Sequence, residues 1–261
     1  MNYTYRITKR GLCSELNSLL GFYESIIGED CKVFIDGRAS QYFKDVSIYD
    51  VFDFPNNFVK EKPSEATMVS SNEWKKTALK RYEFSISPSD AARFFNYTKS
   101  FRERINRTMN RVELPVVFNC FHIRRGDKIG EAYNARFETK GLKEASRYEF
   151  EYYFNRCDQS IKSIFIMTDD YEVITEAKHY INQNKLDHKI FHLTTKTQTG
   201  HSTDTDIKNN RTFTNRELLN FFTEIEIAKR AQQFVGTGSS NIFRYIKNQC
   251  TTNVKLISID I

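Results

Sequence analysis

The order of apolar and polar positions predicts a chain in which strands and helices alternate. Residues 163–168 form a short apolar run, Ser-Ile-Phe-Ile-Met-Thr, of the kind that buried strands show. Apolar side chains recur at helical spacing over residues 171–184, which predicts an amphipathic helix. The same two patterns predict further strands over residues 32–36, 116–123, 189–193, 234–236 and 254–257. They predict further helices over residues 11–26, 91–111, 146–160, 215–231 and 239–248.

This alternation predicts an α/β fold with parallel strands, because a strand followed by a crossover helix usually pairs with the next strand in the same direction. From Pro115 onward the order is regular enough to predict a doubly wound parallel sheet. Residues 194–214 are polar and are expected to form a long loop. We expect two domains, an irregular α/β unit over residues 1–114 and the doubly wound unit over 115–261. Ligands of such sheets bind where the carboxyl ends of the strands meet.

The composition is that of a globular protein. The 261 residues include 39% hydrophobic and 28% charged side chains, which excludes a disordered chain, a collagen and a coiled-coil rod. The net charge of +6 suits a protein that handles phosphates and is too diffuse to require nucleic acid. No apolar run approaches the ~18–20 residues that span a membrane. Since the N-terminus also lacks a signal-peptide pattern, we expect a cytoplasmic protein.

The cysteines and histidines match neither a disulfide framework nor a metal site. The cysteines are scattered without a Cys-x-x-Cys pair, which indicates small buried residues in a reducing compartment. They are Cys13, Cys31, Cys120, Cys157 and Cys250. The spacing of His179, His188, His192 and His201 fits no compact ligand pattern, so we expect no bound metal.

The segment His122–Lys128 is the sharpest chemical feature of the sequence. It follows the mostly apolar residues Val116–Phe121 and contains the adjacent arginines Arg124 and Arg125. Two guanidinium groups at a strand end can form a forked, permanently cationic clamp that suits a pyrophosphate. Asp127 is placed to orient one of them through a bidentate pair. Taken alone, the segment is equally compatible with a surface loop that holds a salt bridge.

Two further polar segments follow predicted strands. Thr168-Asp169-Asp170 ends one strand, and Gly236–Asn241 ends another. The second also begins a helix, so its backbone N–H groups and hydroxyls can receive a phosphate. Alone, paired aspartates suggest a turn and a serine-rich helix start suggests a cap. Three polar segments in order, each after a strand, predict one ligand site at the carboxyl edge of the sheet.

The order of these motifs resembles the fucosyltransferase superfamily of the core α1,6 type and its α1,2 and protein O-fucosyltransferase relatives. The resemblance rests on His-x-Arg-Arg-x-Asp at 122–127, Thr-Asp-Asp at 168–170 and Thr-x-Ser-Ser-x-x-x-Arg at 237–244. Residues 11–20 are similar to the first helix of that family. The resemblance implies a GT-B-like architecture of two Rossmann-like domains, with the acceptor on the N-terminal domain and the donor on the C-terminal one. It also implies GDP-fucose as donor, a glycan hydroxyl as acceptor, inversion at the anomeric carbon, and no required metal or cofactor.

The resemblance further implies roles for the matched residues. Arg124 would stabilise the leaving diphosphate. Glu224 stands where the family has an aspartate that reads guanine N1 and N2, and a glutamate accepts the same two donors. Glu131 lies one residue earlier than the glutamate that serves as base in the α1,6 members. The implied catalytic residues are Arg124, Asp127 and Glu131, and the implied donor-binding residues are His122, Arg125, Lys128, Asp169, Asp170, Glu224, Thr237, Ser239 and Ser240.

The chemistry of sugar transfer is compatible with these residues. Transfer from a nucleotide passes through an oxocarbenium-like transition state, as glycoside cleavage does. The departing diphosphate needs fixed positive charge, which Arg124 can supply, and fixed donors, which a helix start at Ser239 and Ser240 can supply. A carboxylate such as Glu131 would take the proton of the acceptor hydroxyl.

Two other functions fit parts of the sequence. A metal-dependent nucleotide-sugar transferase would use an Asp-x-Asp pair, which Asp204 and Asp206 form within the polar stretch 194–214. A non-catalytic nucleotide or nucleic-acid binder would use the basic helix face at Arg102–Arg111. Sensitivity to a chelator would identify the first, and polyanion binding that falls steeply with salt, without turnover, would identify the second.

Overall fold

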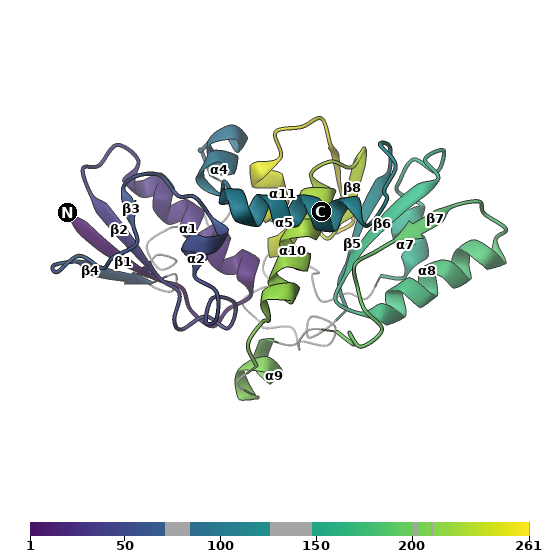
Figure 1. The fold of residues 1–261 in the computed structure, drawn as a ribbon. Helices are drawn as coiled ribbons and strands as arrows, with labels where there is room; N and C mark the ends of the chain where they lie inside the picture. The colour runs from purple at the N-terminus through teal and green to yellow at the C-terminus, as the bar shows by residue number, and fades with distance from the viewer. Residues whose placement is uncertain (71–83, 126–147, 201–202, 210, 261) are drawn as a thin grey trace. The chain divides into compact units, whose positions relative to one another are not determined.

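The computed structural model describes residues 1–70, 84–125, 148–200, 203–209 and 211–260 (Figure 1). The chain divides into two compact units. The first comprises Met1–Arg104, Thr203–Leu219 and Lys247–Thr251, and the second comprises Ile105–Ser202, Asn220–Ile246 and Thr252–Ile261. Two short segments from late in the sequence therefore belong to the first unit, and the domain limits at residue 114 remain a prediction.

The first unit is built on a four-stranded parallel sheet. Its strands are β1 (Asn2–Arg6), β2 (Lys32–Asp36), β3 (Phe58–Val59) and β4 (Thr67–Ser70), in the order β3-β2-β1-β4. Helix α1 (Leu12–Ile26) connects β1 to β2, and the apolar side chains of Leu16, Leu19 and Leu20 are fully buried. The helical periodicity of this stretch in the sequence is therefore confirmed. Helices α2 (Ile48–Val51) and α4 (Pro88–Phe94) and the start of α5 (Lys99–Asn110) complete the earlier part of the unit.

The second unit is built on a five-stranded parallel sheet. Its strands are β5 (Asn119–Ile123), β6 (Ser163–Thr168), β7 (Lys189–Phe191), β8 (Gln233–Gly236) and β9 (Lys255–Ser258), in the order β7-β6-β5-β8-β9. The chain runs outward from β5 to β7 and then returns to the other side of β5 for β8 and β9. This is the doubly wound order, whose switch point lies between β5 and β8. The predicted α/β fold with a doubly wound C-terminal sheet is confirmed.

Helices cover the strands of the second unit and close its core. Figure 1 shows α8 (Tyr171–Gln183) running along β6 and β7, with the short α7 (Phe150–Phe154) beside it. Val173 and Ile174 of α8 are fully buried in one cluster with Phe121 and Ile166 of the sheet. The remaining helices are α9 (Thr203–Lys208), α10 (Asn215–Ala228) and α11 (Asn241–Gln249). Within the described part of the chain, no helix has both the length and the apolar character needed to cross a membrane.

Two predicted elements of the first half differ from the structure. The helix predicted over residues 91–111 is divided into α4 and α5. The chain between them is extended at Tyr97, which forms a β-bridge with Phe52, and the Thr98 hydroxyl then bonds the Asp50 carbonyl at 2.7 Å. The strand predicted from residue 116 begins only at Asn119, since Val116 is 95% exposed and has no partner strand.

Two predictions of the second half are also wrong in extent. Helix α7 takes up only the middle of the helix predicted over 146–160, because Cys157 and Asp158 lead into turns that end at β6. The stretch 194–214, predicted as a loop, contains α9. The sequence pattern gave no sign of β1, β3, β4 or α2, which are short or lie in polar stretches.

His122 and Gly236 pack closely between β5 and β8. They are opposite each other in the β5–β8 pairing. A Cβ added at Gly236 would lie 3.3 Å from His122 Cβ and 3.2 Å from a ring carbon of Phe243, so the glycine makes room for the imidazole. His122 is 3% exposed. Burial, followed by the charge of Arg124, lowers the pKa of His122 to about 3.

The neutral state of His122 predicts a specific loss of stability in acid. Below pH ~6.5 His122 binds a proton in the unfolded chain but stays neutral in the folded protein. The free energy of unfolding therefore falls as the pH drops toward the folded pKa. One such proton contributes a slope of up to about 1.4 kcal/mol per pH unit. We would measure the free energy of unfolding in urea at several pH values between pH 6 and pH 4. Its slope against pH should be smaller in His122→Phe than in the wild type, by the contribution of about one proton. The slope, unlike the absolute stability, is insensitive to altered packing, and an unchanged slope would contradict a neutral buried His122.

Candidate functional site

The three motifs predicted from the sequence meet at one edge of the second sheet. Strand β5 lies between β6 and β8, and the three strands end in register, with Ile123 opposite Thr168 and His122 opposite Gly236. The residues that follow these ends, Arg124, Asp169 and Thr237, therefore emerge side by side at the switch point. This is where doubly wound sheets bind their ligands.

Arg124 and Arg125 have different surroundings. The Arg125 guanidinium donates from Nη1 to the Tyr148 carbonyl at 2.7 Å and from Nη2 to Glu176 Oε2 at 2.9 Å. Its backbone N–H donates to Asp169 Oδ1 at 3.0 Å. Arg125 is only 4% exposed, whereas Arg124 is half-buried. Arg125 therefore binds protein groups and fixes the strand end, and Arg124 directly follows β5 at the edge of the sheet.

Glu176 completes the anchor of Arg125. Its other oxygen accepts a short hydrogen bond from the Phe150 backbone N–H, and Glu149 Oε2 lies 3.6 Å from Arg125 Nη2. The hydrogen bond from Arg125 to the Tyr148 carbonyl therefore joins two positions that are far apart in the sequence. The stretch between them contains Asp127, Lys128 and Glu131, whose predicted roles lie outside the described residues. Nothing in the sequence pattern singled out Glu176, which is one polar position among several on an amphipathic helix.

Glu224 lies within electrostatic reach of the same edge. It belongs to α10 and is 9% exposed. Burial, followed by the negative charge of Asp169, raises the pKa of Glu224 well above its ordinary range. Glu224 in turn contributes, after burial, to the raised pKa of the Cys120 thiol in β5. The carboxyl to which the resemblance gives a role in base recognition thus has a raised pKa, caused by burial and by the charge of Asp169.

Asp170 forms part of the local structure at this edge. It is the N-cap residue of α8, where its carboxylate accepts the Glu172 backbone N–H at 2.9 Å. Its own N–H donates to Thr168 Oγ1 at 3.2 Å. Of the two predicted aspartates, Asp169 therefore contacts the strand end of β5, and Asp170 starts a helix.

The turn after β8 gathers hydrogen-bond donors, as the sequence predicted. Thr237, Ser239 and Ser240 are each at most 6% exposed. The Ser240 N–H donates to the Thr237 carbonyl at 2.9 Å, and Ser240 Oγ accepts the Ile242 N–H at 3.2 Å to cap α11. The side chain of Thr237 hydrogen-bonds that of Tyr153.

The remaining donors of this turn bind a carboxylate that the sequence reading missed. Asp260 accepts the backbone N–H groups of Gly238 and Ser239 and also bonds the Ser239 hydroxyl. The rule that found the other motifs, a polar residue just past a strand, would have found it, since Asp260 comes two residues after β9. The turn thus already binds an anionic group, as expected of N–H groups that precede a helix.

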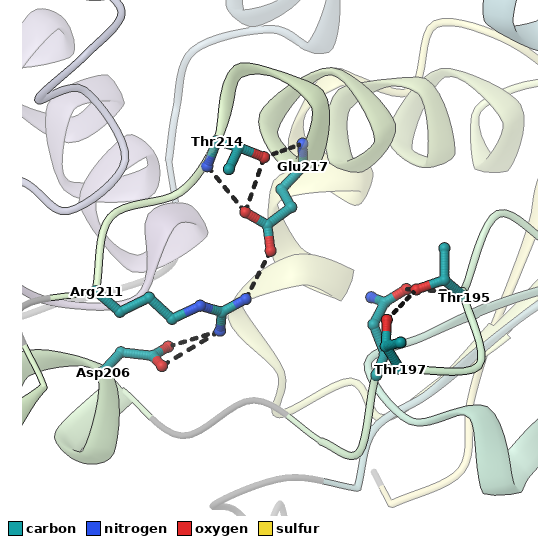
Figure 2. A network of polar contacts seen from close by, with 7 residues as sticks. Thr195, Thr197, Asp206, Arg211, Thr214 and Glu217 are labelled. Carbon is teal, nitrogen blue, oxygen red and sulfur yellow. Dashed lines mark hydrogen bonds and ion pairs between the residues drawn. The ribbon is translucent and has the colours of Figure 1, made fainter.

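Asp206 of the Asp-x-Asp pair is held by an ion pair, and the side chain of Asp204 lies outside the described part of the chain. Asp206 is buried in α9 and pairs with Arg211 Nη1 at 3.2 Å, while Arg211 Nη2 bonds Glu217 at 2.6 Å (Figure 2). Glu217 and Thr214 form a reciprocal capping box at the start of α10. These contacts give Asp206 a structural role. Among the residues that the structure describes, no group of three or more His, Cys, Asp or Glu side chains could hold a metal ion.

Two arginines of the basic face at Arg102–Arg111 make local contacts. Arg102 bonds the Asn96 side chain at 3.0 Å and lies over the Tyr97 ring, and Arg104 bonds Asn215 at 2.7 Å. These two arginines are thus held by neighbouring side chains of their own unit, whereas a nucleic-acid binder presents its cations to phosphates.

Comparisons with known proteins identify the fold. No protein-family model matches the sequence, and no curated protein sequence matches it. The crystal structure of NodZ alpha-1,6-fucosyltransferase co-crystallised with GDP superimposes with a TM-score of 0.50 at 10% identity, covering 95% of this chain and 92% of NodZ. NodZ from Bradyrhizobium gives a TM-score of 0.49 at 12% identity, covering 95% and 93%, and POFUT1 in complex with GDP gives 0.44 at 13% identity, covering 98% and 72%. The chain has a fucosyltransferase-like fold with two Rossmann-like sheets, as its motifs predicted.

Proposed function

We propose that this protein is an inverting, metal-independent glycosyltransferase that moves fucose from GDP-fucose to a glycan hydroxyl. The observation that carries the proposal is that Arg124 and the donor-rich turn Thr237–Ser240 follow neighbouring strands at the switch point of the second sheet. Glu224 supports it, since the charge of Asp169 at the same edge contributes to its raised pKa. A cation, a carboxyl and a cluster of N–H and O–H donors are what a diphosphate joined to a guanine base would bind. The fucosyltransferase-like fold, one example of which was crystallised with GDP, supports the same donor.

In this mechanism Arg124 neutralises the charge that builds on the diphosphate as the bond to the sugar breaks. A fixed guanidinium at the edge of a sheet needs little reorganisation during the reaction, which makes it effective in stabilising a developing charge. Arg125 is a positioning residue, because its contacts with Asp169 and Glu176 fix the strand end from which Arg124 projects. His122 stays neutral and adds no further charge beside Arg124.

The acceptor side of the mechanism is assigned by the motif resemblance. Glu131 is the proposed base that takes the acceptor proton, with Asp127 and Lys128 contributing to the donor site. A single displacement by the acceptor oxygen would invert the anomeric carbon, and the diphosphate would leave from the opposite face. We place the acceptor on the N-terminal domain.

Turnover of GDP-sugars in the presence of a chelator tests the proposal directly. GDP release should be fastest with GDP-fucose and a glycan acceptor, because the site provides cationic and N–H groups for the diphosphate without a metal. Activity should survive EDTA. Loss of activity that manganese restores would instead favour a metal-dependent transferase, and absence of turnover with every GDP-sugar would contradict the proposal.

The buried carboxyl of Glu224 predicts opposite changes in stability and in nucleotide selectivity. Because the folded protein retains a proton that the unfolded chain loses above pH ~4.3, Glu224 lowers the free energy of unfolding as the pH rises. Glu224→Gln should therefore raise Tm at pH 8, by about 2–4 °C per kcal/mol gained. It should also weaken GDP binding by roughly tenfold or more, because an amide accepts only one of the two guanine donors. UDP and ADP affinities should change little.

Glu226→Gln is the matched control for this experiment. Glu226 is on the same helix, is 5% exposed and pairs with Lys229 at 2.7 Å. Its replacement should lower Tm and leave GDP selectivity unchanged.

Wild-type affinity for GDP should rise with pH as Glu224 gives up its proton, and calorimetry in buffers of different ionisation enthalpy would detect the released proton. Equal affinity of the wild type for GDP, UDP and ADP would remove Glu224 from this role.

Arg124 should be essential for turnover and less important for binding. Arg124→Ala should lower turnover of GDP-fucose by ~10²-fold or more, the effect of removing one donor to the transition state. GDP affinity should fall much less, because the donors of the turn after β8 remain. Arg124→Lys should restore little of the lost turnover, because lysine keeps the positive charge but lacks the planar guanidinium that donates two hydrogen bonds side by side. Arg156→Ala, which removes an arginine stacked on Tyr152 in the same unit, should retain turnover. A folded Arg124→Ala protein with near-normal turnover would contradict the assignment.

A further inference from the structure

The turn that is proposed to receive the diphosphate of the donor already binds a carboxylate of its own chain. Asp260 Oδ1 accepts the Gly238 backbone N–H at 2.6 Å, and Oδ2 accepts the Ser239 N–H at 3.3 Å. The Ser239 hydroxyl makes a short hydrogen bond to the same carboxylate, and Ser258 Oγ bonds Oδ1 at 2.9 Å. A single anionic group thus accepts hydrogen bonds from two backbone and two side-chain donors.

These contacts are those that a phosphate would make. Phosphate oxygens and carboxylate oxygens both accept from successive backbone N–H groups at the start of a helix, and both are held by a neighbouring hydroxyl. Gly238 and Ser239 immediately follow Thr237, which comes directly after the end of β8 at the switch point. Asp260 is therefore bound at the place where the sheet topology directs a ligand.

Asp260 is not required to cap helix α11. Ser240 already provides the cap through its contact with the Ile242 N–H at 3.2 Å. The partners of Asp260 lie before that cap, in the turn itself. A further polar atom lies at the same strand end without a hydrogen-bond partner in the described structure: the buried His122 Nδ1, which is 3.7 Å from the Cβ position of Gly236. The turn thus offers hydrogen-bonding groups beyond those needed to start the helix.

We propose that Asp260 is an internal competitor of the donor diphosphate. Its carboxylate holds the N–H and hydroxyl groups of Gly238 and Ser239, and a diphosphate must displace it to bind them. The Asp260 carboxylate and a diphosphate cannot bind the same donors together, because the two anions repel each other and each N–H or O–H group makes one strong hydrogen bond at a time. The affinity for a nucleoside diphosphate thus depends on how much more strongly the turn binds the diphosphate than it binds the Asp260 carboxylate. This inference rests on the proposed function of the turn.

Asp260→Asn tests the competition without removing the side chain. The amide keeps the size of the carboxylate and one oxygen acceptor, but it lacks the charge that makes these hydrogen bonds strong. We expect GDP and inorganic pyrophosphate to bind Asp260→Asn about tenfold more tightly than the wild type in isothermal titration calorimetry. Guanosine, which has no phosphate, should bind both proteins equally.

A second variant controls for net charge. Asp187→Asn removes a negative charge from an exposed pair with Lys162 in the same unit, and its affinity for pyrophosphate should match the wild type. Circular dichroism and Tm would verify that Asp260→Asn is folded. Unchanged or weaker GDP binding by folded Asp260→Asn, with GDP still bound by the wild type, would overturn the competition and leave the proposed function intact. No binding of GDP or pyrophosphate by either protein would contradict both.

Discussion

The parallel pairing of β5 with β6 on one side and β8 on the other is the constraint on which the site depends. It fixes three strand ends at a common level, so residues more than a hundred positions apart in the sequence emerge together. His122 and Gly236 are in close contact in that pairing, and a side chain at Gly236 would crowd both His122 and Phe243. A buried neutral histidine and a glycine thus preserve the spacing between the ends of β5 and β8.

Buried charge is distributed around this edge so that few groups remain uncompensated. Arg125 binds Glu176 and the Tyr148 carbonyl, and Asp169 accepts the Arg125 backbone N–H. Burial and the charge of Asp169 raise the pKa of Glu224, which favours its neutral form and lowers the cost of a second buried anion. Asp260 satisfies the N–H groups of the turn after β8. Each arrangement stabilises the fold with groups that also have the chemistry of a nucleotide site.

Adjacent residues at this edge of the sheet differ in what they contact. Arg124 and Arg125 are chemically identical and consecutive, yet successive residues leaving a strand point to opposite sides. The guanidinium of Arg125 is buried where Glu176 Oε2 and the Tyr148 carbonyl accept its hydrogen bonds, and Arg124 is half-buried. The same contrast separates Asp169 from Asp170, of which only the second caps a helix.

The sequence by itself determined the α/β class, the doubly wound second sheet and the three strand-end motifs, because burial leaves a periodic pattern and parallel topology brings strand ends together. It could not show that Arg125 is buried in an ion pair, that Asp206 pairs with Arg211, or that Asp260 occupies the turn after β8. A pattern of residue types along the chain does not show which partner each of these charged side chains binds. The break between α4 and α5 also depended on a distant partner, Phe52, whose bridge to Tyr97 overrides local helical periodicity. Only the tertiary structure decided which charged side chains face protein and which face the site, because that choice depends on what packs against them.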